Sequence, residues 1–149
     1  MSTQYASRAA LATAWLVAQL PAVVALPNEQ IVDGPPSEAN LKSTCVILGD
    51  ITHEQNWAAL GARNRDENTS LQLTIYVLGP GQTQTAVNES AYALLALIEI
   101  WLRNNISAAM TVIPGLQWIE IMPKSLNKQP GDNARLAYLD CDIKYFARI

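Results

Sequence analysis

The chain has 149 residues, of which 15% carry a charged side chain and 50% are apolar, and its net charge is −3 at pH 7. Soluble domains average about 25% charged residues, so we expect another molecule to cover part of this surface. The acidic balance excludes a protein that wraps nucleic acid with a basic face. The length is typical of one domain, and we predict a single domain over residues 1–149.

The N-terminal apolar run predicts the first helix, over residues 3–20. Ser2 or Thr3 can cap its start, and Pro21 is expected to stop it soon after. The run also resembles a signal peptide, but Gln19 and Pro21 interrupt it, and it is too short for a membrane span. We therefore expect a helix that packs within the fold, and no membrane partner.

Strand candidates follow the first helix. Residues 29–32 form a short one, ended by the turn signal at residues 33–36, and residues 44–48 form a compact β-branched strand. Residues 50–66 show no clear period and are predicted as a long loop, a feature that is usually functional or stabilised by a partner. Residues 71–77 alternate apolar with polar and predict a half-buried strand.

The second helix is predicted over residues 85–103 and carries an apolar stripe that should face the core. Further apolar residues lie outside that stripe, so the helix is apolar nearly all the way round. The stripe consists of Val87, Ala91, Leu94, Leu95, Ile98, Trp101 and Leu102, and the residues outside it are Tyr92, Ala96, Leu97 and Ile100.

Two more strands complete the prediction. Residues 116–122 predict one strand, residues 123–132 a polar hairpin loop, and residues 137–149 a long alternating strand. Two helices among mostly sequential strands predict an α+β fold. In this fold an antiparallel or mixed β-sheet packs against two main helices on one face.

The sequence holds no catalytic signature. His53 is the only histidine, and a metal shared with Asp50 and Glu54 would lack the further ligands that such sites need. We therefore predict a protein that is not an enzyme, with no catalytic residue, no cofactor and no metal. Cys45 and Cys141 lie in apolar strand-like runs and are predicted to be buried thiols rather than a disulfide.

The stretch around Arg63 and Arg65 is the best candidate for a contact with another protein. Arginine is enriched at interfaces, lysine is depleted there, and guanidinium groups bind carboxylates in bidentate fashion. An ordinary solvated loop before a strand remains the alternative. We assign Arg63, Arg65, Glu67, Trp57 and Asp33 to a subunit or partner interface.

Three stretches carry a family resemblance: residues 31–35 (IVDGP), 46–50 (VILGD) and 61–67 (GARNRDE). An apolar helix precedes them, and an alternating strand, a long apolar helix and two strands follow. With this order of features the chain resembles the tail terminator, or tail completion, proteins of long-tailed bacteriophages, especially those that infect actinobacteria. The resemblance covers nearly the whole chain.

The resemblance implies a structural virion protein that caps the tail tube as a hexameric ring and stops tube polymerisation. It implies an α/β sandwich, with sheets meeting between neighbouring subunits. The implied partners are further copies of the chain, the tail tube protein and the head-completion (stopper) proteins that dock on the ring, with DNA only as cargo through the lumen. The implied location is the head-proximal end of the virion tail, and the host cytoplasm during assembly.

Two other functions stay open at this point. A head–tail stopper or adaptor of the phage neck would also be a ring protein, so composition does not separate it from a tail terminator. A small enzyme or ligand-binding module would use the region of Asp50, His53 and Trp57, and would be a monomer or dimer with a histidine-dependent activity. The size of the protein, alone or mixed with tail tubes, distinguishes these classes.

Overall fold

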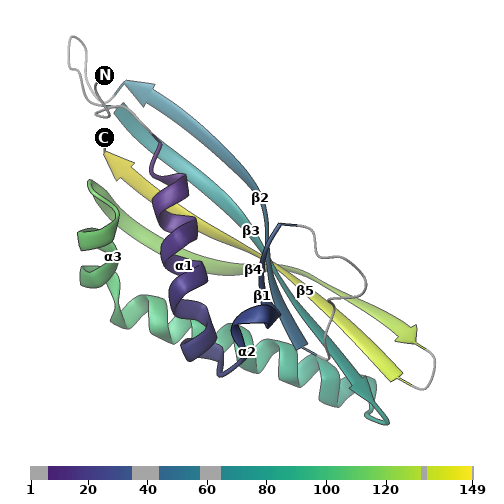
Figure 1. Cartoon of the computed structure of the whole chain (residues 1–149). Helices are drawn as coiled ribbons and strands as arrows, with labels where there is room; N and C mark the ends of the chain where they lie inside the picture. The colour runs from purple at the N-terminus through teal and green to yellow at the C-terminus, as the bar shows by residue number, and fades with distance from the viewer. Residues whose placement is uncertain (1–6, 35–43, 58–64, 132–133, 149) are drawn as a thin grey trace.

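The computed structural model describes residues 7–34, 44–57, 65–131 and 134–148. A long, twisted sheet carries its helices along one face (Figure 1). The elements in chain order are α1 (Ala9–Val24), η1 (Asn28–Gln30), β1 (Ile31–Asp33), β2 (Thr44–Trp57), β3 (Arg65–Pro80), α2 (Gln84–Asn104), α3 (Ile106–Val112), β4 (Leu116–Gly131) and β5 (Ala134–Arg148).

The five described strands form one sheet in the order β1-β2-β3-β5-β4. β1 pairs with β2 in parallel over three residues, and the other pairs are antiparallel. This mixed sheet with its helices confirms the predicted α+β fold class. Because β5 lies between β3 and β4, the last described strand is an interior strand of the sheet.

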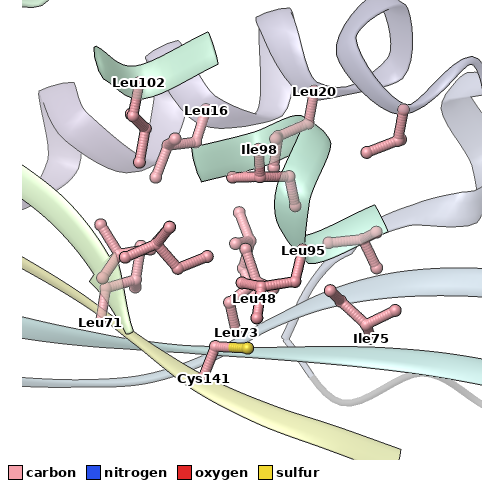
Figure 2. Packing of buried hydrophobic residues seen from close by; sticks show 14 of the residues in the cluster. Leu16, Leu20, Leu48, Leu71, Leu73, Ile75, Leu95, Ile98, Leu102 and Cys141 are labelled. Atoms are coloured by element: carbon pink, nitrogen blue, oxygen red, sulfur yellow. The ribbon is translucent and has the colours of Figure 1, made fainter. Parts of the chain in front are cut away.

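The core is one apolar layer between the sheet and the two long helices. Figure 2 shows Leu16 of α1 and Ile98 of α2 above Leu73 of β3, and each of these side chains is fully buried. α1 and α2 also contact each other through Trp15 and Trp101, whose stacked rings have centroids 4.7 Å apart. The apolar stripe predicted for the second helix faces this layer through Val87, Ala91, Leu95, Ile98 and Leu102.

α1 lies later in the sequence than the helix predicted over residues 3–20. It begins at Ala9 and continues through Pro21 to Val24. Pro21 removes the backbone donor that would bond to the carbonyl of Val17, and only three further residues of helix follow it. Ala25 then ends the helix in the left-handed conformation, with φ 56° and its N–H bonded to the carbonyl of Pro21.

β2 and β3 are longer than predicted, and the loop predicted over residues 50–66 is wrong at both of its ends. β2 continues through the first half of that stretch and β3 begins before it finishes, while residues 58–64 lie outside the described chain. The pairing of β2 with β3 shifts register between Leu48 and Ile51. This shift changes which side chains of β2 face the helices, so no single period spans the strand.

β4 likewise continues through residues 123–131, which their polar composition predicts as a hairpin loop. Pro123 is accommodated because β4 is an edge strand, and its pairing with β5 shifts register between Pro123 and Ser125. The short helix α3 has no counterpart in the sequence prediction. It spans a single stretch of seven residues without a side-chain cap.

Cys45 and Cys141 are both buried and no disulfide joins them, as predicted. Burial, together with the neighbouring carboxylates of Asp140 and Asp142, raises the pKa of the Cys141 thiol to about 12. This thiol therefore stays protonated and unreactive near neutral pH.

We predict that Ile98→Ala lowers the free energy of unfolding by about 2–5 kcal/mol, because it opens a cavity beneath α2. The neighbouring Leu97 is 46% exposed, whereas Ile98 has no exposed surface. Leu97→Ala is therefore the matched control and should cost no more than about 0.5 kcal/mol. Urea unfolding of both variants measures the difference, and equal losses would show that the stripe is not the buried face.

Candidate assembly interface

Two strand segments at one end of the sheet have an edge that pairs with no described strand. β1 covers β2 only at residues 46–48, so residues 51–57, here called the β2 edge, pair with β3 alone. On the other side of the sheet, residues 116–122 of β4, here called the β4 edge, pair with β5 alone. One side of each segment lies at the border of the described sheet, where another strand can pair.

The two edges lie level with each other across the sheet. Ile51 of the β2 edge pairs with Leu71, and Leu71 pairs with Ile143. Ile143 in turn pairs with Ile121 of the β4 edge. One row of residues therefore crosses four strands from one unpaired edge to the other.

The rest of β4 is protected against pairing with another strand. Pro123 and Pro130 cannot donate a backbone hydrogen bond, and Lys124 and Lys128 add cations to the same stretch. Proline, lysine and register shifts are devices by which natural edge strands avoid aggregation. Neither the β2 edge nor the β4 edge contains a proline or a lysine. Within the described sheet, the edges that lack both proline and lysine are therefore confined to one end, and the β4 edge carries one register shift, between Leu116 and Trp118.

Exposed apolar side chains lie beside both edges. Ile51 is 39% exposed on the β2 edge, and Trp118 and Met122 are 41% and 37% exposed on the β4 edge. A hollow of about 340 Å³ crosses the four strands between the edges. It is lined by Thr52, His53, Glu54, Asn68, Thr69, Ser70, Trp118, Lys144 and Tyr145.

The residues weighed as metal ligands do not converge. His53 and Glu54 are neighbours in β2, so their side chains point to opposite faces of the sheet. Across the described ranges, no three His, Cys, Asp or Glu side chains gather closely enough to hold a metal ion.

A buried carboxylate ties the β2 edge to the first helix. Glu67 of β3 is fully buried and accepts hydrogen bonds from Gln55 of the β2 edge, at 2.7 Å, and from the Tyr145 hydroxyl of β5. It also accepts from the Ser7 hydroxyl and the Arg8 backbone N–H, each at 3.1 Å. The N-cap residue Arg8 contributes no side-chain cap to α1. Glu67 thus places its negative charge at the positive end of that helix.

The charge of this cluster is set by competing effects. Burial alone raises the pKa of Glu67, but the hydrogen bonds to its carboxylate, that of Tyr145 foremost, outweigh burial and hold the pKa below its ordinary value. Burial and the bond to Glu67 raise the pKa of Tyr145. Nδ1 of His53 lies 4.0 Å from the carboxylate. Glu67 is therefore ionised at neutral pH and acts as the shared acceptor.

The residues predicted to share an interface lie in different places. Trp57 and Arg65 pair with each other at the end of the β2 edge, and only their backbones are described. Arg63 lies outside the described residues. Asp33 is exposed and pairs with Leu48, roughly 30 Å from Trp57 along β2 at about 3.3 Å per residue. The structure therefore places Trp57 at the end of the β2 edge, Arg65 opposite it on the interior strand β3, and Asp33 elsewhere.

Glu67 is buried inside its own chain, where its carboxylate has no surface left for a partner, so the partner-contact assignment is dropped for this residue. Sequence reasoning also missed Gln55 and Tyr145 as its partners. The alternation of side chains along the strand could have shown this. Glu67 is an even number of residues from Leu71 and Leu73, so it lies on the same face of the strand, and that face points to the core. An acidic residue on that face needs partners from its own fold.

We predict that Glu67→Gln lowers the free energy of unfolding by about 1.5–3 kcal/mol at neutral pH, because a charged acceptor is lost. The pKa of Glu67 is lower in the folded than in the unfolded chain. Its contribution is therefore present above the ordinary pKa of 4.5 and is lost as the pH falls through the folded value. Urea unfolding of wild type and variant should differ at neutral pH and converge in acid. A difference that stays constant with pH would contradict this assignment.

No protein-family model matches the chain, and no curated protein is similar to it in sequence. Among solved structures, a chain of the structure described as "Virion of native gene transfer agent (GTA) particle" aligns with a TM-score of 0.40 and 15% identity. The alignment covers 96% of this chain and 99% of that chain. Within the described chain, each helix is too short or too polar to cross a membrane.

Proposed function

We propose that the chain is the subunit of a ring that caps a phage tail tube and ends its growth, the role that the resemblance to tail terminator proteins implies. The observation that carries this proposal is the pair formed by the β2 edge and the β4 edge, which lie at one end of the described sheet and contain no proline or lysine. In a monomer, strand edges without proline or lysine invite aggregation. A subunit that pairs them with its neighbours removes that hazard.

The two edges suit a head-to-tail contact because they run in opposite directions. β2 is antiparallel to β3, β3 to β5, and β5 to β4, so β2 and β4 are antiparallel to each other. Rotation about an axis roughly along the strands brings the β2 edge of one copy beside the β4 edge of the next as an antiparallel pair. Repetition of a contact between unlike surfaces closes a ring when the rotation allows it. The number six follows from the resemblance.

The outer face of α1 supports an assembled state. Residues Ala9–Val24 include no charged side chain. Leu11 is 42% exposed on this helix, and Ala14 and Ala18 are exposed as well. A helix that is apolar on all sides is normally covered. We assign this face to contacts with the tube or with the head-completion proteins, and the role as a whole is structural and needs no catalysis.

Lysine substitutions at the edges test the ring. We expect Ile51→Lys and Trp118→Lys each to abolish ring formation on purified tail tubes, because a charged side chain on an edge strand blocks pairing. Leu97→Lys is the matched control, since Leu97 is 46% exposed and lies on the helix α2 rather than on a strand. Negative-stain microscopy reads the outcome, and circular dichroism verifies folding.

The same images separate the two ring functions. Overlong tails in particles assembled with an edge variant support tail termination. Tails of normal length that lack heads would instead indicate a stopper of the neck. Rings formed by both edge variants would refute the pairing of the edges.

A charge reversal at Arg65, which pairs with Trp57, tests the contact proposed near the end of the β2 edge. We predict that Arg65→Glu weakens ring formation by about 2–5 kcal/mol, the range for a charge buried between subunits. Arg135 pairs with Gly79 at the opposite end of the sheet from Arg65, so Arg135→Glu makes the same charge change away from the contact. Titration of ring formation against subunit concentration compares the two variants, and equal effects would place Arg65 outside the contact.

A further inference from the structure

One side of α2 faces neither the sheet nor another described element. It is lined by Glu89, Tyr92, Ala96, Ile100 and Arg103, all of which are exposed. Tyr92 and Ile100 are 45% and 56% exposed, and the Arg103 side chain is 74% exposed. Large exposed apolar side chains in a row, bounded by charges, are typical of a contact surface.

The spacing of these five residues is symmetric. Ala96 is the midpoint, with Tyr92 and Ile100 four residues to either side of it. Glu89 and Arg103 lie a further three residues out. Steps of three, four, four and three keep the five residues on one side of a helix, here called the seam, because residues three and four apart are neighbours on its surface. The side chains of this seam are therefore apolar in its centre, acidic at one end and basic at the other.

We propose that this seam binds the same seam of a second copy of the chain, with the two α2 helices antiparallel about a two-fold axis at Ala96. In this pair Glu89 of each copy meets Arg103 of the other, and Tyr92 packs against Ile100. The small Ala96 side chains let the two backbones approach at the axis. A two-fold contact needs a self-complementary surface, and this seam is one.

The charges select this partner and this orientation. A parallel pair would place Glu89 against Glu89 and Arg103 against Arg103, whereas the antiparallel pair matches opposite charges at both ends. Arg103 already donates to Glu99 of its own helix at 2.6 Å. Its guanidinium has five N–H donors, so it can bind a second carboxylate as well.

The seam is too small for a permanent dimer. Arg103 lies fourteen positions after Glu89 in the sequence. At about 1.5 Å per residue and about 10 Å of helix width, the seam therefore covers roughly 200 Å². A standard interface buries about 800 Å² on each partner. The pair is therefore reversible. The seam points away from the sheet and leaves both strand edges open, so this contact is independent of the proposed role in the tail.

A cysteine at the proposed axis tests the contact. We expect mild oxidation of the purified full chain carrying Ala96→Cys to give disulfide-linked dimers about tenfold faster than oxidation of Ser107→Cys, because the contact raises the local thiol concentration. Ser107 is exposed on α3, and the native thiols Cys45 and Cys141 are buried. Equal rates for the two variants would overturn the proposal. So would cross-linking of Ala96→Cys to added tail tube protein in place of a second copy.

Charge reversal in the Ala96→Cys background tests the antiparallel register. Glu89→Arg alone and Arg103→Glu alone should each slow cross-linking about three- to tenfold, because each reverses both ion pairs of the two-fold contact. The double variant Glu89→Arg/Arg103→Glu restores opposite charges and should recover the rate. Single variants without effect, or a double variant as slow as the single ones, would overturn this arrangement.

Discussion

The apolar layer between the sheet and its two long helices sets the position of every other element, and its length is limited by those helices. α1 and α2 have 16 and 21 residues, which span about 24 and 32 Å at about 1.5 Å per residue. β3 has 16 residues and spans about 53 Å at about 3.3 Å per residue. The sheet therefore extends beyond its helical cover. Where the apolar layer ends, the inward positions of β3 change from Leu71 to Thr69 and Glu67, and a polar cluster at the start of α1 closes the core.

The limited length of the apolar layer also explains why some elements could be predicted from the sequence and others could not. The stripe of α2 and the alternation in β3 and β5 are strong because those residues lie under or within the apolar layer. The outer parts of β2 and β3 carry polar residues on both faces, and the register shift after Leu48 changes the phase, so periodicity fails there. Pro123 indicates a loop by local rules, yet it lies within an edge strand at a second register shift, which only the sheet order reveals.

The candidate site was less predictable because its geometry depends on contacts between distant parts of the sequence. Glu67 and Tyr145 are 78 residues apart, and no local pattern joins them. The open edges follow from the sheet order, in which β1 stops short and β4 lies outside β5. Arginine content indicated the junction of β2 and β3, and the structure puts Arg65 on β3, opposite Trp57 at the end of the β2 edge. The same reasoning assigned Glu67 to the surface, because composition alone does not show on which face of a strand a residue lies.

The interior place of β5 has a consequence for the nascent chain. During translation α1 emerges long before β5, but the carboxylate at its N-terminus comes from β3 and is held by a hydroxyl from β5. Until β5 inserts between β3 and β4, each of those strands lacks a neighbour, and α1 lies beside an incomplete sheet. Pairings this distant in sequence form slowly and leave unpaired strands exposed in the meantime. Folding of this subunit is therefore expected to finish only after its last strand has left the ribosome, and the period before that is when a chaperone would be most useful.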